Sequence, residues 1–221
     1  MRISKELVEV NSSVALLCFK YETIVNTDNA KMWEHIEQIA IPKIMKSYVI
    51  ENLTEQPEIR EARKTYKMLG KDPSRYRVSS EALLRRILQG KGLYKVNNVV
   101  DCNNLISIET ALPCGSYDME KVRGDLVFRI GKVGESYEGI GKELINVENL
   151  PVFADSSGAF GSPTADSKRT MITENTTKVI TVLISFSGAD IFKKHADMMQ
   201  KCLVELLGAK NIERTIIRSE I

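Results

Sequence analysis

Two stretches of the chain place short polar side chains between segments that are apolar enough to form a core. The first, 97–104, combines four asparagines with Asp101 and leads through an apolar segment to 112–118. The second, 155–170, combines serines and threonines with Asp166 and Arg169. Amides, carboxylates and hydroxyls beside buried strands either cap backbone groups or line a polar pocket, because an unpaired buried polar group costs about 1 to 3 kcal/mol. The residues alone leave both interpretations open.

The sequence lacks the residue patterns of several common catalytic and cofactor-binding sites. A Ser-His-Asp hydrolase needs a base beside its nucleophile, yet His35 and His195 fall in helical patterns and no Gly-x-Ser-x-Gly motif occurs. Gly139-Ile140-Gly141 lacks the third glycine of a dinucleotide-binding loop. The acidic residues lack metal-binding spacing, and the four widely separated cysteines suit neither a disulfide framework nor a zinc site. We therefore expect no metal and no other cofactor, and we expect the cysteines to be small buried side chains.

The region 71–95 has the largest local excess of basic residues, seven against two acidic ones. Because the whole chain has 31 basic and 29 acidic residues, only such a local patch could attract a polyanion. The predicted phosphate contacts are Arg75, Arg77, Arg85 and Arg86. The alternative is a solvated helix face whose arginines pair with carboxylates elsewhere.

Helices are predicted mainly in the first half of the chain. Apolar residues at helical spacing lead to Pro42, where a kink or a new helix must begin because proline cannot extend the hydrogen-bond ladder. A second helix has Pro57 in its first turn and ends at Gly70. A third begins near Ser79 and ends at Gly90.

Strands are predicted at the start of the chain and in its second half. The segment 14–19 is apolar on both faces, which is typical of a strand covered on each side. From Leu126 onward, short β-like segments alternate with glycines, and the most apolar of them is 179–186. An amphipathic helix over 189–207 and a polar, frayed tail after Gly208 complete the chain. This order of elements predicts an α+β fold.

Length and composition are typical of one globular domain, which we place at 1–221. The chain has 221 residues, of which 43% are hydrophobic and 27% are charged. No apolar run approaches the about 18 residues of a membrane span, and acidic residues occur too early for a secretory signal. We therefore expect a cytoplasmic protein without a membrane partner, in an oligomeric state that the sequence leaves open.

A family resemblance spans roughly Arg75 to Phe186. It is carried by 96–101, Asn104, Leu112-Pro113, Tyr117-Asp118 and 124–129. These motifs are similar to the tRNA-editing region of the phenylalanyl-tRNA synthetase beta chain, which is built from its third and fourth modules. The stretch 77–86 resembles freestanding members of that family more than the synthetase itself. The core is therefore expected at 75–186, with family-specific additions at both ends.

The resemblance implies a β-sandwich-like core flanked by helices, and a pocket that in the synthetase hydrolyses tyrosine wrongly attached to phenylalanine tRNA. The asparagine of the family's editing Thr-Asn pair falls on Asn104, and the threonine falls on Asn103. The editing histidine falls on Gly115 and the editing glutamate on Val182, so we expect a different amino acid as substrate. Aminoacylation by this chain alone is not expected.

Two functional hypotheses follow. In the first, a freestanding editing-like hydrolase binds the 3′ end of a misacylated tRNA and cleaves the ester in trans, since an activated ester needs only a positioned water and donors for the oxyanion. In the second, the same pocket binds an amino acid or an aminoacyl group without catalysis, or the domain binds a partner. No catalytic residue is assigned. The predicted pocket residues are Asn98, Asp101 and Asn104 for the amino acid, and Asp166, Ser167, Arg169, Thr170 and Thr173 around the ester or the terminal adenosine.

Overall fold

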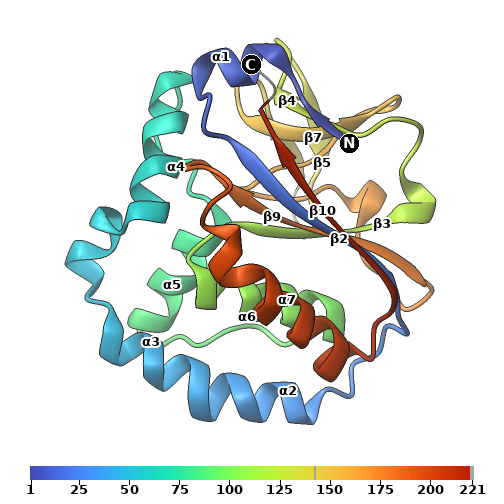
Figure 1. Ribbon diagram of the computed structural model, residues 1–221. Helices are drawn as coiled ribbons and strands as arrows, with labels where there is room; N and C mark the ends of the chain where they lie inside the picture. Colours follow the sequence, from blue (N-terminus) through green and yellow to red (C-terminus); the bar gives the residue numbers. More distant parts are fainter. Residues whose placement is uncertain (142, 220–221) are drawn as a thin grey trace.

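Two four-stranded β-sheets form the centre of the computed structural model, which describes residues 1–141 and 143–219 (Figure 1). The first sheet contains, in spatial order, β1 (Arg2–Ile3), β4 (Val127–Ile130), β7 (Pro151–Asp155) and β8 (Gly158–Gly161). The second sheet contains β10 (Lys210–Arg218), β2 (Ala15–Glu22), β9 (Lys178–Ser185) and β3 (Cys114–Asp118). A separate hairpin joins β5 (Ser136–Glu138) and β6 (Leu144–Asn146).

Helices cover the outer side of the second sheet and fill much of the first half of the chain (Figure 1). The α-helices of the described residues are α1 (Lys5–Val10), α2 (Ala30–His35), α3 (Ile41–Ser47), α4 (Pro57–Met68), α5 (Ser79–Leu88), α6 (Asn98–Thr110) and α7 (Phe192–Leu207). Short 3₁₀ or π segments are η1 (Ile36–Ala40), η2 (Ile50–Glu55), η3 (Met119–Lys121) and η4 (Lys168–Thr170). The prediction of an α+β fold with a sandwich-like core and flanking helices is confirmed.

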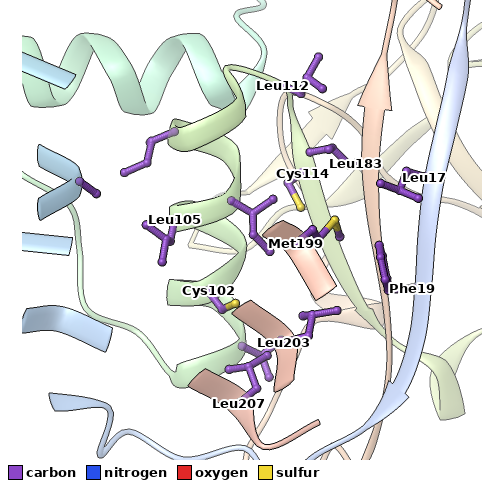
Figure 2. Close-up of a cluster of buried hydrophobic side chains, with 14 of the residues drawn as sticks. Leu17, Phe19, Cys102, Leu105, Leu112, Cys114, Leu183, Met199, Leu203 and Leu207 are labelled. Atoms are coloured by element: carbon purple, nitrogen blue, oxygen red, sulfur yellow. The ribbon is translucent and has the colours of Figure 1, made fainter. Parts of the chain in front are cut away.

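The inner strands β2 and β9 of the second sheet are buried on both faces, as the apolar segment 14–19 predicts for β2. Alternate side chains of β2 point to opposite sides. Leu17 and Phe19 pack with the helices, whereas Leu16 and Cys18 pack against the first sheet. Figure 2 shows the helical side of this core, where Leu17, Phe19 and Leu183 of the sheet face side chains of α6 and α7. The sheet therefore holds α6 in a fixed position, which matters for the site described below.

The proline and glycine signals locate the helix boundaries correctly. Helix α4 begins at Pro57, and Gly70 follows its end with a φ of +74°. Helix α5 is followed in the same way by Gly90, with a φ of +72°. At Pro42 the helical path changes from the π-helical segment η1 to α3, as expected for a residue that cannot donate a backbone hydrogen bond.

Two segments differ from the sequence-based expectations. The tail after Gly208 is not frayed, because Lys210–Arg218 form β10 and pair antiparallel with β2 over most of its length. The asparagine-rich stretch 97–104 lies mostly in the first two turns of α6, a helix with buried residues on every side. A helix buried all round has no single apolar stripe, so helical periodicity does not reveal it.

The four cysteines are free thiols. Cys18, Cys102 and Cys114 are buried, as predicted, and Cys202 is partly accessible. Of the helices in 1–141 and 143–219, none is both long enough and apolar enough to cross a membrane.

Candidate functional site

The first turn of α6 is used to anchor the helix. Asn98 accepts a hydrogen bond from the backbone N–H of Asn26 at 3.0 Å and donates to the carbonyl of Ile24 at 2.9 Å. Asp101, which is 1% exposed, accepts from the indole N–H of Trp33 at 2.7 Å. These contacts place Asn98 and Asp101 outside the cavity described below. Both side chains take the capping and tying role that the sequence left open.

Further along α6, the side chain of Asn103 is hydrogen-bonded to strand β3. The Asn103 amide donates to the carbonyl of Cys114 at 3.0 Å and accepts from the Ser116 hydroxyl at 3.1 Å. Ser116 in turn lies 2.8 Å from the hydroxyl of Thr181 on the neighbouring strand β9. This chain of hydrogen bonds fixes the orientation of Asn103, and Asn104 beside it lines an open cavity.

The cavity has a volume of about 340 Å³ and lies where α6, β3 and the segment after β8 meet. This volume is at the small end of the range for ligand pockets, about 300 to 1,000 Å³, and suits a ligand the size of an amino acid. Its apolar wall consists of Val96, Val100, Ile140, Met171 and Ile172. Its other lining residues are Ser79, Asn103, Asn104, Cys114, Ser116, Ser162, Thr164, Ala165 and Asp166. The two polar stretches singled out in the sequence therefore meet here through Asn104 and Asp166.

Asp166 is the carboxylate of this cavity. Its Oδ1 accepts a hydrogen bond from the Tyr117 hydroxyl at 2.9 Å. The residue lines the cavity and is partly accessible, and burial of its carboxyl group raises the pKa of Asp166 to about 7. Hydrogen bonds with Tyr117 and with the Ser162 backbone oppose the rise. Asp166 can therefore exchange a proton near neutral pH.

Tyr117 is held between two glycines. A Cβ atom at Gly115 would lie 2.5 Å from the Tyr117 hydroxyl oxygen, and one at Gly161 would lie 2.5 Å from both that oxygen and a ring carbon. The ring also makes edge contacts with Phe153 and Phe160, with centroids 5.5 Å and 5.0 Å apart. No side chain fits at Gly115 or Gly161 while Tyr117 occupies this space.

Gly115 and Val182, the positions to which the sequence resemblance assigns the editing histidine and glutamate, are neighbours in the second sheet. Gly115 of β3 pairs with Val182 of β9 in the strand register. Val182 is fully buried in the core between the two sheets, so its side chain does not line the cavity. Neither Gly115 nor Val182 is among the described lining residues of the cavity.

Three of the four other predicted residues of the second stretch, Ser167, Arg169 and Thr173, have structural partners. The Ser167 hydroxyl caps η4 by accepting from the Arg169 N–H at 3.0 Å, and the Arg169 guanidinium forms a two-point ion pair with Asp155 at 2.8 and 3.0 Å. The Thr173 N–H donates to the Thr176 hydroxyl at 3.0 Å. Thr170 is fully buried, and its hydroxyl has no hydrogen-bond partner among the described residues. None of Ser167, Arg169, Thr170 and Thr173 lies in the described lining of the cavity.

The basic patch is partly neutralised by one buried carboxylate. Glu81 is inaccessible to solvent, and it accepts from Arg63 at 3.0 Å and from Arg85 at 2.9 Å, with Arg77 at 3.8 Å. The guanidinium of Arg86 instead stacks 3.8 Å above the ring of Tyr94. Arg75 is exposed and forms no ion pair with another described residue. Of the four predicted phosphate contacts, Arg75 is therefore the one whose guanidinium is most available to an external phosphate.

Sequence reasoning assigned no site role to Ser116 or Tyr117. Strand alternation is the signal that could have identified Ser116. Residues 114 and 116 of a strand point to the same side, so Ser116 lines the cavity together with Cys114. Tyr117 required knowledge of the fold, since Gly161, whose missing side chain leaves room for its ring, is distant in sequence.

The fold and cavity define a class of protein, a two-sheet α+β domain with an amino-acid-sized cavity at a sheet edge. The family model of the B3/4 domain matches residues 61–214, so the chain belongs to the B3/4 domain family.

Curated relatives bear the name phenylalanine–tRNA ligase beta subunit. The protein from Solibacter usitatus is 28% identical over 162 residues, which cover 72% of this chain and 18% of the relative. The protein from Protochlamydia amoebophila is 31% identical over 105 residues, or 44% of this chain and 12% of the relative. The chain therefore corresponds to a small part of these proteins.

A solved structure shares the fold. It is an N-terminal fragment of the phenylalanyl-tRNA synthetase beta subunit from Pyrococcus horikoshii, with a TM-score of 0.50 and 13% sequence identity. The match covers 98% of this chain and 49% of that fragment.

Proposed function

We propose that the cavity binds the aminoacyl end of a charged tRNA and that the domain hydrolyses the ester in trans. The observation that carries the proposal is that Asn104 and Asp166, from two distant polar stretches, line one cavity of amino-acid size. Membership of the B3/4 domain family, with relatives named phenylalanine–tRNA ligase beta subunits, supports tRNA as the carrier. Free thiols and the translation role suggested by these relatives support a cytoplasmic location.

The proposed reaction needs few groups. Water adds to the ester carbonyl carbon, the bond from that carbon to the ribose oxygen breaks, and the products are a free amino acid and tRNA with its terminal hydroxyl restored. An amide donor in the cavity wall, such as that of Asn104, is of the type that stabilises the developing oxyanion. Asp166 supplies an acceptor in the same wall.

A panel of tRNAs, each charged with a different non-cognate amino acid, tests this function. We expect the protein to release at least one amino acid faster than buffer does, and Asn104→Ala to slow that release at least tenfold. Asn175→Ala, which removes an exposed amide outside the cavity lining, is the matched control and should match the wild type. If every tRNA of the panel releases its amino acid no faster than in buffer, the proposal of a hydrolase is wrong.

The second candidate is a non-catalytic module that binds an amino acid or an aminoacyl group. Gly115 and Val182 favour it, because they stand where the synthetase has its editing histidine and glutamate. Calorimetry with free amino acids and with uncharged tRNA separates the candidates, since a pure binder gives saturable heat without turnover. Binding of tRNA should also weaken steeply with salt, in proportion to the phosphates contacted.

A further inference from the structure

The cavity lining contains one side chain that carries a charge, Asp166. The other described lining residues are apolar or carry hydroxyls and amides, except for the Cys114 thiol, whose pKa is raised by burial. No lysine, arginine or histidine of the described residues lines the cavity. An ionised Asp166 therefore makes this space selectively attractive to a positive group.

The Asp166 carboxylate is held in place before any ligand binds. Its Oδ1 is bonded to the Tyr117 hydroxyl, and Tyr117 cannot move toward Gly115 or Gly161 without closing on their backbones. The backbone carbonyl of Asp166 accepts from the Ile140 N–H at 3.1 Å. Such preorganisation reduces the conformational entropy lost when a ligand binds.

We infer that Asp166 binds the free α-ammonium group of the ligand, so that the cavity selects amino acids and aminoacyl groups with an unmodified amine. The inference rests on the proposed function and specifies its substrate class. A hydrogen bond between an ammonium and a carboxylate is roughly twice as strong as one between neutral groups.

The remaining walls match the other substituents of an α-carbon. The apolar wall, which includes Val100, Met171 and Ile172, suits an uncharged side chain. The amide N–H groups of Asn103 and Asn104 provide hydrogen-bond donors for the carbonyl group. An α-amino group has a pKa of about 7.7 to 8.0, so it is positively charged at neutral pH. The cavity thus offers one chemically matched region for each polar or apolar arm of an aminoacyl group.

Calorimetry with two series of stable ligands tests this inference on the full chain. The first series contains the amides of alanine, valine, leucine, methionine and phenylalanine, and the second contains the corresponding α-hydroxy amides. The two series differ only in an ammonium or a neutral hydroxyl at the α-carbon. We expect the best amino-acid amide to bind at least tenfold more tightly than its α-hydroxy analogue.

Asp166→Asn should abolish this preference while keeping the hydrogen bond with Tyr117, because an asparagine oxygen still accepts it. Asp125→Asn removes one exposed carboxylate outside the cavity lining and should keep the wild-type preference. Equal binding of both series to the wild type, or an unchanged preference in Asp166→Asn, would overturn ammonium recognition and leave an amino-acid cavity standing. If neither series binds and no mischarged tRNA is hydrolysed, the proposed function falls and the inference falls with it.

Discussion

Two buried carboxylates in this molecule have opposite surroundings. Glu81 of α5 is inaccessible to solvent and is contacted by the guanidinium groups of Arg63 and Arg85. Asp166 lies in a cavity wall, with a tyrosine hydroxyl as its side-chain partner and no ion pair with another described residue. A carboxylate with cations on several sides is occupied by the structure itself. One that is buried without a cation costs stability unless a ligand supplies the charge.

The difference between these carboxylates distinguishes acidic groups that stabilise the fold from an acidic group that is available to a ligand. Asp155, with its two-point contact to Arg169, belongs with Glu81. Asp101 has no cation beside it, but neutral donors from Asn29 and Trp33 occupy its carboxylate. The surroundings of Asp166 raise its pKa to about 7. A perturbed group in a cavity is a candidate for binding or catalysis when its geometry also fits.

The largest effect is expected from Glu81→Gln. Loss of the negative charge leaves Arg63 and Arg85 beside a buried neutral amide, and breaking a buried ion pair costs about 3 kcal/mol or more. Urea unfolding should show this loss. Glu205→Gln, which disrupts an exposed pair with Lys201, should change stability by only about 0.5 kcal/mol. Equal losses of stability in the two variants would show that the buried ion pairs of Glu81 stabilise the fold no more than an exposed pair does.

Gly161→Ala should destabilise the protein by about 2 kcal/mol, because the added methyl group overlaps the ring of Tyr117. The same substitution should displace the tyrosine hydroxyl from Asp166 and so alter the titration of that carboxyl group. Combining it with Tyr117→Leu tests the cause. The stability loss of the double variant should be smaller than the sum of the losses of the two single variants, because the clash is absent when the tyrosine ring is absent. Additive losses would show that Gly161 is required for another reason.

Asp166→Asn should be more stable than the wild type above pH 7 and lose that advantage on acidification. The pKa of Asp166 is raised from 3.8 to about 7 in the folded protein. Between these values the unfolded chain ionises before the folded one, so wild-type stability falls as the pH rises and the penalty levels off above about pH 7. At about 1.4 kcal/mol per pKa unit, the shift from 3.8 to about 7 corresponds to roughly 4 kcal/mol. We expect a smaller difference of about 1.5 kcal/mol, because the residue is partly accessible to solvent.

Urea unfolding of both proteins at pH 4.5 and pH 8 measures this difference. If the variant is more stable by the same amount at both pH values, the surroundings of Asp166 do not raise its pKa.

Local signals in the sequence were sufficient for much of the scaffold. Pro57 and Gly70 mark a helix because ring geometry and positive φ act on the backbone directly, without help from the rest of the fold. Strand β10 escaped prediction because it is an edge strand with mostly exposed, polar side chains, which resemble a loop until a partner strand is known.

The candidate site was harder to predict because the same residue types serve two purposes. Asn98 and Asn104 lie on one helix six residues apart, yet one anchors the helix start and the other faces the cavity. Nothing local distinguishes them, since what differs is the neighbouring chain: 24–26 against Asn98 and the cavity against Asn104. The environment of Asp166 depends on Tyr117, 49 residues earlier.

The smallest effect concerns charges on the surface, where the same contrast between paired and free groups applies. Arg85 is committed to Glu81, whereas Arg75 is exposed without an ion pair to another described residue. If the protein binds tRNA through this patch, Arg75→Gln should lower the slope of log affinity against log salt by about 0.7 to 0.9, the value for one phosphate contact. Lys193→Gln, which removes a charge already paired with Asp190 in another part of the chain, should leave the slope unchanged. A slope equally affected by both would mean that net charge, rather than a contact at Arg75, drives the association, because a nonspecific field does not depend on which lysine or arginine supplies it.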